Sequence, residues 1–285
     1  MSPIMYIQKA SGEKVPFSEG KLRKSLVKAG AGKKLANEIA HQIGKRLVPG
    51  TSTQQIYEDA FVLLAAESQP VAGKYKLKAA IMELGPSGFP FERYVAAILK
   101  YQGFDVQVGQ IIQGHCVSHE IDVIALMGDQ HFMVECKFHN RPGFRCDVKI
   151  PLYIQSRFLD IEKQWLLIPG HGTKFHQGWV VTNTRFTSDA IQYGTCAGLH
   201  LVGWNYPSKR SLNEMIDAAG LYPITCLTSL TKAEKDKLLE NDIVLCQELC
   251  DQEELLHKLG ISPERIPIIL KEGYELCNNP AYQNT

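Results

Sequence analysis

Residues 119–140, HEIDVIALMGDQHFMVECKFHN, hold two short apolar runs on either side of the dipeptide Gly128-Asp129. A Gly-Asp pair between two such runs predicts a two-residue turn that joins antiparallel strands. The turn would pair Met127 with Gln130, and every other pair in the hairpin follows by counting back from it. The stretch therefore predicts a β-hairpin with a defined register.

This register also predicts which side chains share a face of the hairpin, because residues two apart in a strand point to the same side. One face would carry polar residues, with Asp122 opposite Glu135 and Glu120 opposite Lys137. The other face would carry the apolar residues between them: Ile121, Val123, Val134 and Cys136. Three carboxylates and one lysine on a single face cannot all be charged without cost unless a further cation joins them, because one lysine does not offset the repulsion among three carboxylates.

A divalent ion would relieve this repulsion. Mg²⁺ is held in proteins by one or two carboxylates, and Asp122 and Glu135 are the predicted ligands, with Glu120 beside them. Such an ion activates water and stabilises charge on a phosphate, and Lys137 would orient or deprotonate that water. The alternative is a solvated hairpin face with incidental charges, and the spacing alone leaves both interpretations open.

The segments around the hairpin predict an α/β fold. Gly85-Pro86-Ser87-Gly88 ends a helical region, and helices and short apolar runs alternate after it. This order predicts a mixed sheet flanked by helices over 88–205. Residues 1–87 show helical periodicity after a short extended start, with Ser18 as the cap of the first predicted helix and the last one over about 71–84. A further helical pattern covers about 148–164, and 206–285 predict a small helical domain. We therefore expect three domains: 1–87, 88–205 and 206–285.

Charge is distributed unevenly over the 285 residues. The net charge of +1 combines a net +6 in 1–87, a neutral middle segment and a net −5 in 206–285. A basic N-terminal segment indicates an anionic ligand such as a nucleotide or nucleic acid, although a lysine-rich solvated surface has the same composition.

Composition and cysteine usage predict a soluble, cytoplasmic protein. Apolar residues make up 45% of the chain, yet no apolar run approaches the roughly 18 residues that span a bilayer. The N-terminus lacks the apolar core of a signal peptide. Eight scattered cysteines without a CxxC pair indicate reduced thiols rather than a disulfide framework.

The hairpin motif also resembles a known family. Asp122, followed after twelve residues by Glu135-Cys136-Lys137, is similar to the D…ExK signature of the PD-(D/E)xK nuclease superfamily, with Ile121 in place of its proline. The preceding helix, which contains Glu92, and the following one, which contains Gln155, resemble those of Mrr-like restriction endonucleases. The resemblance implies that Glu92 and Gln155 join the catalytic set.

This resemblance implies an activity. It implies a DNA endonuclease that depends on Mg²⁺ or Mn²⁺, hydrolyses phosphodiester bonds and leaves a 5′-phosphate. Cutting both strands of a duplex would suit a homodimer. The alternative is a nucleotide-sensing, DNA-binding regulatory protein that does not cleave DNA.

The first segment resembles the ATP-cone over residues 3–84. The resemblance rests on Lys9-Ala10-Ser11-Gly12, Val15-Pro16-Phe17, Lys21-Leu22 and an Ala-Gly helix end. It implies that ATP or dATP binds as an effector, with Lys9 and Lys21 at the phosphates. Ala10 and Ser11 replace the usual Arg and Asp, so a cone that serves only as a structural or DNA-contacting module stays open.

The last segment carries weaker signals. Its leucines ahead of Gly260-Ile261 loosely resemble helix-hairpin-helix DNA modules. Its net acidity disfavours a broad contact with phosphates. A helical packing or protein-interaction domain is an equally good interpretation.

Overall fold

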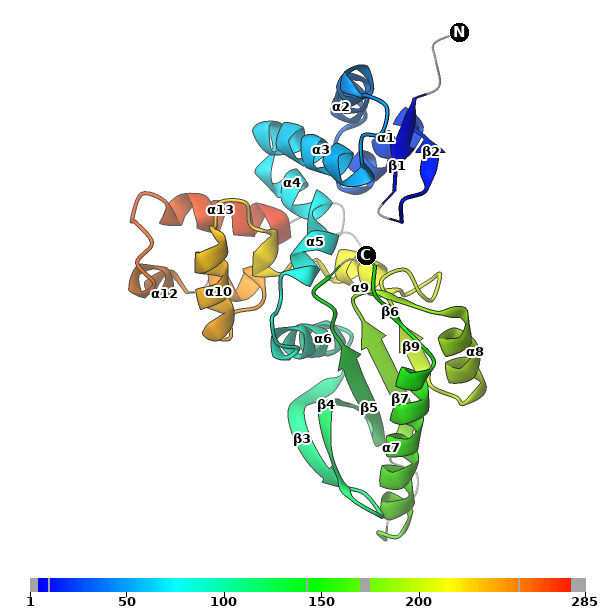
Figure 1. Cartoon of the computed structure of the whole chain (residues 1–285). Coiled ribbons are helices and arrows are strands. Elements are labelled where there is room, and N and C mark those ends of the chain that lie inside the picture. The colour runs from blue at the N-terminus through cyan, green and yellow to red at the C-terminus, as the bar shows by residue number, and fades with distance from the viewer. Residues whose placement is uncertain (1–4, 10, 142, 170–174, 251, 278–285) are drawn as a thin grey trace. The chain divides into compact units, whose positions relative to one another are not determined.

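The computed structural model of the chain describes residues 5–9, 11–141, 143–169, 175–250 and 252–277 (Figure 1). These residues form two compact units. One consists of 81–221, and the other combines residues up to 80 with those from 222 onward. The units thus divide the chain differently from the predicted domains, because the C-terminal helices pack with the N-terminal segment. The three-domain division itself stays a prediction.

The unit of residues 81–221 is built on a five-stranded mixed sheet with strand order β3-β4-β5-β7-β9. Strands β3 to β5 are antiparallel, whereas β5, β7 and β9 run parallel. Its elements are α6 (Phe89–Tyr101), β3 (Asp105–Gln113), β4 (Ser118–Met127), β5 (Gln130–Lys137), β6 (Arg145–Cys146), α7 (Lys149–Leu166), β7 (Phe175–Thr182), β8 (Arg185–Phe186), α8 (Ser188–Cys196), β9 (His200–Val202) and α9 (Leu212–Ala219). The predicted mixed α/β architecture is confirmed, and a nuclease core stays a prediction.

The predicted hairpin has the expected register. Met127 pairs with Gln130, and the pairing continues to Val123 and Val134. Gly128 adopts a φ of 59°, the left-handed conformation that such a turn requires of its first residue. The short parallel pair of β6 and β8 has no counterpart among the predicted elements, because two residues are too few to show a period.

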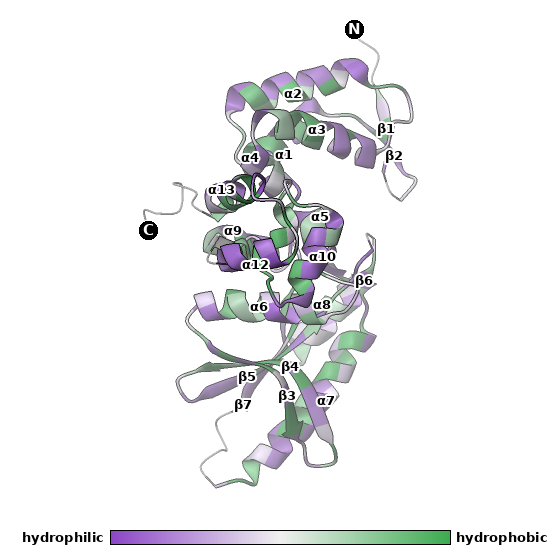
Figure 2. Ribbon diagram, turned by 90° about the vertical axis from the view of Figure 1, so that its left-hand side faces the viewer, coloured by the Kyte–Doolittle hydropathy of each residue, from purple (hydrophilic) through white to green (hydrophobic). Residues whose placement is uncertain are grey.

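The helix α7 packs on one face of the sheet. Ile154, Phe158 and Ile161 are buried in a core that includes Met133 of β5 and Val180 of β7. Burying each such side chain stabilises the fold by about 1.5–3 kcal/mol. The β5 residues that alternate with Met133, such as Val134 and Cys136, point away from α7, toward the side where α6 lies (Figure 2). The sheet is therefore covered on both faces.

The other unit is mainly helical. Its elements are β1 (Tyr6–Gln8), β2 (Lys14–Pro16), α1 (Glu19–Lys28), α2 (Lys33–Arg46), α3 (Thr53–Glu67), α4 (Gln69–Tyr75), α5 (Leu77–Met82, which contains the unit boundary), η1 (Ile224–Cys226), α10 (Lys232–Glu240), α11 (Cys246–Cys250), α12 (Glu253–Lys258) and α13 (Ile266–Cys277). The Ser18 hydroxyl caps α1 by accepting from the Lys21 amide at 3.3 Å, as the sequence predicts. The prediction of a single helix over 71–84 is wrong. Two helices, α4 and α5, cover this region, and Lys76 forms a turn between them.

An ion pair joins α10 to the start of α13. The Arg265 guanidinium donates to both carboxylate oxygens of Glu234, at 2.5 and 2.9 Å. This pairing lowers the pKa of Glu234 to about 2. Thr231 and Glu234 also form a capping box at the N-terminus of α10.

Glu234→Gln is expected to lower the free energy of unfolding by about 1–2 kcal/mol near neutral pH, because a charge-assisted pair is lost. The folded pKa of Glu234 lies below its unfolded value. The stabilisation is therefore present above about pH 4.5 and is lost as the pH falls toward about 2. Urea unfolding of both proteins, followed by circular dichroism, measures the difference. A difference that does not narrow at about pH 2.5 contradicts the assignment.

Within the part of the chain that the structure describes, no helix is both long and apolar enough to cross a membrane. The cytoplasmic location stays a prediction.

Candidate active site

The predicted polar face of the hairpin lies where β4 begins and β5 ends. In β4, Asp122 stands opposite Gly109 of β3, whose φ is 64°, and the regular β3–β4 pairing is interrupted between these two residues. On the other side of β4, the regular pairing with β5 runs from the turn to Val123 and stops there, so Asp122 is the first residue outside it. Irregular strands of this kind occur beside functional sites, where they re-aim a side chain.

Asp122 uses its carboxylate to join the two strands where their pairing stops. Its Oδ2 accepts a hydrogen bond from the Cys136 amide at 2.7 Å. The pKa of Asp122 is raised, mainly because burial disfavours the charged form, although this hydrogen bond and Lys137 act in the opposite direction.

Glu135 is the most buried of the predicted site residues, with only 1% of its surface exposed. Glu135 lies two residues after Met133 in β5, so its side chain shares the face of Met133 and points toward α7 rather than into solvent. Burial and the neighbouring Asp122 raise the pKa of Glu135 to about 6, even though Lys137 and Arg157 lower it. A solvated face with incidental charges does not fit a carboxylate in this environment.

Two cations flank the Glu135 carboxylate. Arg157 Nη1 of α7 lies 2.6 Å from Oε1, and Lys137 Nζ lies 3.4 Å from Oε2. The Arg157 contact is close but is not aligned as a hydrogen bond. Within the described residues, Oε1 has no hydrogen-bond donor. One oxygen of a buried carboxylate thus keeps unused acceptor capacity.

Glu92 approaches the same site from the first turn of α6. Its pKa is raised to about 7, first by burial and then by the charges of Asp122, Glu120 and Glu135. The structure therefore brings Glu92 into the electrostatic field of the hairpin carboxylates. The prediction of Glu92 as a site residue rested on the resemblance to Mrr-like enzymes and not on hairpin spacing, because α6 and the hairpin are distant in sequence.

Glu120 and Gln155 lie at the edge of this group. The Glu120 side chain is exposed, and its backbone carbonyl accepts a hydrogen bond from Arg157 Nη2. The Gln155 Oε1 atom is buried and has no hydrogen-bond partner within the described part of the chain. Neither side chain forms a hydrogen bond or ion pair with the Asp122 or Glu135 carboxylate within the described residues, although the charge of Glu120 helps to raise the pKa of Asp122.

Arg157 is a site residue that the sequence analysis did not single out. Its guanidinium connects α7 to both hairpin strands, through the Glu120 carbonyl and the Glu135 carboxylate. It also lies over the Tyr153 ring, with Cζ 5.4 Å from the ring centroid. The sequence carries no signal for these contacts beyond a basic residue close to Gln155, because only tertiary packing brings α7 to the hairpin.

No group of three or more His, Cys, Asp or Glu side chains suited to a metal ion occurs in the ranges that the structure describes. The donor set here is the carboxylate pair of Asp122 and Glu135. A pair is the number of protein carboxylates that Mg²⁺ commonly uses, because it keeps several waters. The raised pKa values of the two carboxyl groups fit a place for an added cation, and Arg157 Nη1 already lies 2.6 Å from Glu135 Oε1 on one side of that place.

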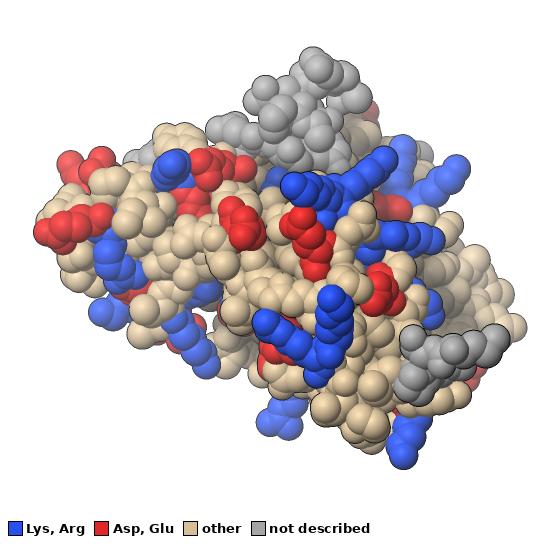
Figure 3. All heavy atoms as spheres, turned by 90° about the horizontal axis from the view of Figure 1, so that it is seen from above, with Lys and Arg blue, Asp and Glu red and all other residues tan. Residues whose placement is uncertain are grey.

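The predicted nucleotide-binding lysines lie in the N-terminal unit. Lys9 Nζ pairs with Glu13 Oε2 at 2.8 Å in the turn between β1 and β2, and Lys21 is exposed on α1. Ala10 lies outside the described residues. A pocket of about 370 Å³ in this unit has a different, basic lining: Arg23, Lys24, Val27, Lys33 and Asn37. Figure 3 looks onto the side where β1, β2 and α2 lie and shows Lys and Arg side chains spread over it, with Asp and Glu among them.

Comparison with protein families identifies both ends of the chain. Residues 5–78 match the ATP cone domain, which confirms the predicted ATP-cone and places the chain among proteins with a nucleotide-sensing module. Residues 222–277 match the domain described as AF1548-like, C-terminal. A helix-hairpin-helix module is not among these matches. The two matched regions belong to the same compact unit.

Relatives that match about two thirds of the chain extend this result. An uncharacterized protein of Archaeoglobus fulgidus is 37% identical over 180 residues, which cover 63% of this chain and 97% of the relative. A crystal structure titled as a protein of unknown function, AF1548, is 35% identical with a TM-score of 0.55, over 67% of this chain and 98% of that one. A structure of Can2 from Sulfobacillus thermosulfidooxidans with cyclic tetra-adenylate is 14% identical with a TM-score of 0.31, over 64% of this chain and 50% of that one. The first relative is matched over nearly its whole length at well above 30% identity, and so this chain belongs to the AF1548-like family.

Proposed function

We propose that this protein is a Mg²⁺-dependent DNA endonuclease whose ATP cone binds ATP or dATP as an effector. The observation that carries the proposal is Glu135, a buried carboxylate with a raised pKa, beside Asp122 and Lys137 where the pairing of β4 with β5 stops. Burying such a carboxylate costs folding free energy, and perturbed carboxyls of this kind cluster at catalytic sites.

Asp122 and Glu135 would hold the metal ion. The carboxylates of Glu120 and Glu92 interact electrostatically with Asp122 and would add to the negative charge that attracts the ion. Mn²⁺ would suit the same oxygen ligands. When bound, the ion supplies activation of water and stabilisation of the charge that develops on the phosphate.

The chain's own residues would carry the remaining steps. Lys137 Nζ would orient the attacking water or take its proton, and it would offset charge on the phosphoryl group. Arg157 would hold Glu135 in place from α7. Gln155, with an open buried oxygen, would position water or substrate. The product would carry a 5′-phosphate, as in the nucleases that the hairpin motif resembles.

The ATP cone would act as a sensor and not as a motor. Lys9 and Lys21 would contact the phosphates as point charges, and nucleotide turnover is not expected. The homodimer suggested by the sequence is tied to duplex cleavage and stays a prediction.

One observation favours the alternative of a nucleotide-sensing, DNA-binding regulator without cleavage. Glu135 already lies between two cations, Arg157 and Lys137, and these partly neutralise it without a metal. A protein that retained the fold only as a DNA clamp would keep such a pair. It would bind DNA and nucleotide and release no product.

The test is cleavage of labelled DNA by the full chain with Mg²⁺ or with EDTA, in the presence and absence of ATP and dATP. The substrates are plain and methylated duplex, single strand, flap and four-way junction. Product that depends on Mg²⁺ supports the nuclease. DNA binding without product on every substrate transfers support to the regulator.

Mg²⁺ itself is expected to stabilise the wild-type protein, because it binds the folded site and not the unfolded chain. At about one hundred times its dissociation constant the gain would be about 2.7 kcal/mol. Asp122→Asn is expected to remove most of this gain, measured as the shift of the melting temperature with added Mg²⁺. A matched control is Asp105→Asn, an exposed carboxylate at the start of β3. An equal shift in wild type and Asp122→Asn contradicts the assigned ligand.

A further inference from the structure

The segment that follows the predicted catalytic strand β5 is held firmly at His139. The Asn183 side chain accepts from the His139 amide at 2.9 Å and donates to its carbonyl at 2.7 Å. The His139 Nε2 atom lies 3.5 Å from the buried Cys146 sulfur. Three contacts thus fix a residue that follows Lys137 by two positions.

Phe144 lies against this fixed ring. Its ring and that of His139 are 5.6 Å apart between centroids and only 13° from parallel. Even so, 54% of Phe144 is exposed. An aromatic ring that is supported on one side and open to solvent is a preorganised surface for another flat group.

Two arginines flank the same segment on the β6–β8 pair. Arg145 and Arg185 are directly paired across the two parallel strands, and both are exposed. Neither forms an ion pair with a carboxylate within the described residues. The nearby Asp147 carboxylate instead accepts from the Lys149 amide at 3.0 Å. Like charges on neighbouring strands destabilise a sheet, and a bound anion would relieve this cost.

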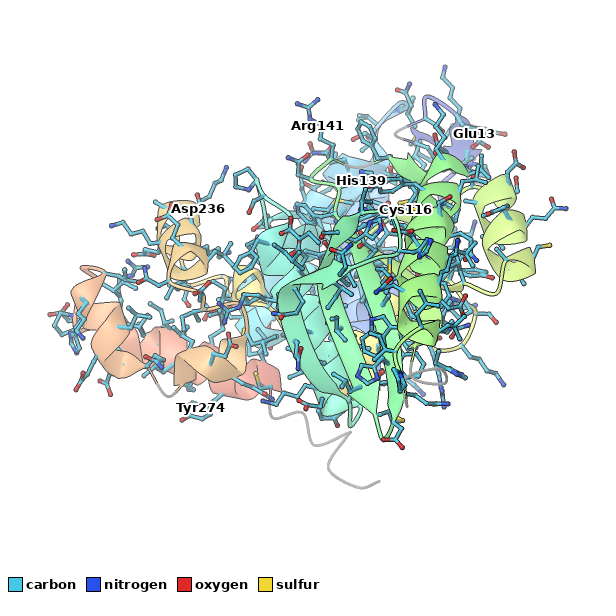
Figure 4. The ribbon with its side chains drawn as sticks, turned by 90° about the horizontal axis from the view of Figure 1, so that it is seen from below. Glu13, Cys116, His139, Arg141, Asp236 and Tyr274 are labelled. Carbon is cyan, nitrogen blue, oxygen red and sulfur yellow. The ribbon has the colours of Figure 1, made fainter. Side chains whose placement is uncertain are left out.

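This surface is linked directly to the candidate active site. Thr182 Oγ1, at the end of β7, donates to the Lys137 carbonyl at 2.7 Å and lies 3.2 Å from Thr184 Oγ1. Arg185 follows Thr184 in the chain. The Arg141 side chain projects outward beyond His139 in Figure 4 and adds a further exposed cation to the segment that carries Phe144 and Arg145.

We propose that Phe144, Arg145 and Arg185 form a binding surface for single-stranded DNA that leads to Lys137; the proposal rests on the nuclease function given above. The arginines would contact phosphates, and Phe144 would stack on a base. Bases offer their faces for stacking only when they are unpaired, so an exposed ring beside a cation pair selects a single strand over a duplex.

The test is fluorescence anisotropy of a labelled single strand of about 12 nucleotides, within the usual range of site sizes, and of its duplex. The full-length protein is kept in EDTA so that no cleavage takes place. Phe144→Ala is expected to weaken single-strand binding about fivefold or more, and Phe144→Trp to retain it. Arg185→Ala is expected to reduce the slope of log affinity against log salt by about 0.7, the value for one lost phosphate contact.

Matched controls are Tyr101→Ala and Lys100→Ala, exposed residues at the end of α6 that should leave binding unchanged. Equal or tighter binding of duplex, no binding at all, or no effect of Phe144→Ala would overturn the proposal. Cleavage of the same strands in Mg²⁺ separates the two ideas. Cleavage that is independent of Phe144 would contradict the proposed single-strand binding surface and still support the nuclease function. Binding that depends on Phe144, without cleavage, would contradict the nuclease function and still support the single-strand binding surface.

Discussion

Lys137→Ala is expected to lower the rate of Mg²⁺-dependent DNA cleavage by about 10²–10⁴-fold, the usual loss when a group that moves a proton is removed. The reason lies in its position. The ammonium group is 3.4 Å from the buried Glu135 carboxylate and is 28% exposed, so it can face both the acidic site and a substrate. Single-turnover cleavage of the preferred DNA substrate measures the effect.

Two further variants separate catalysis from folding in this experiment. Lys163→Ala removes an exposed lysine of α7 and should cleave like the wild type. Lys137→Arg keeps the positive charge beside Glu135 but not the compact amine, so it should retain the fold and little activity. Circular dichroism and melting temperature verify the fold of each variant. Wild-type cleavage by folded Lys137→Ala would exclude Lys137 from the mechanism.

Glu272→Ala is expected to lower the free energy of unfolding of its unit by about 3–5 kcal/mol. The Glu272 carboxylate of α13 is 2% exposed and accepts four hydrogen bonds, from the amide and hydroxyl of Thr228 and of Ser229. Truncation would leave these donors without their acceptor in a buried place.

The measurement must report on the correct unit. All three tryptophans, Trp165, Trp179 and Trp204, belong to the 81–221 unit, so their fluorescence does not follow α13. Hydrogen exchange of the α13 amides does. Glu275→Ala, at an exposed position of the same helix, is the control and should cost less than about 0.5 kcal/mol. A loss below about 1 kcal/mol for Glu272→Ala would contradict its structural importance.

Local patterns were sufficient for much of the secondary structure. The Gly128 turn set the hairpin register, because a two-residue loop leaves only one way to pair its strands. Helices such as α1 and α7 begin within a residue or two of their predicted starts, since caps and apolar spacing act over a few residues. The split between α4 and α5 was missed, because no proline or buried polar residue marks Lys76 in the sequence.

The candidate site divides in the same way. Alternation along two strands predicted that Asp122, Glu135 and Lys137 would lie together, because strand periodicity is a local property. It did not predict that Glu135 would be buried beneath α7 and paired with Arg157. The approach of Glu92, with its raised pKa, also depends on how α6 packs.

The chain's periodicity, turns and caps therefore specified its elements and the order of acidic and basic residues along them, since these depend on neighbours a few positions apart. Tertiary packing alone determined that 222–277 joins the N-terminal segment and that Glu135 is removed from water. It also placed Phe144 on the His139 ring. These features depend on which distant surfaces exclude water from each other, and no local pattern encodes that choice.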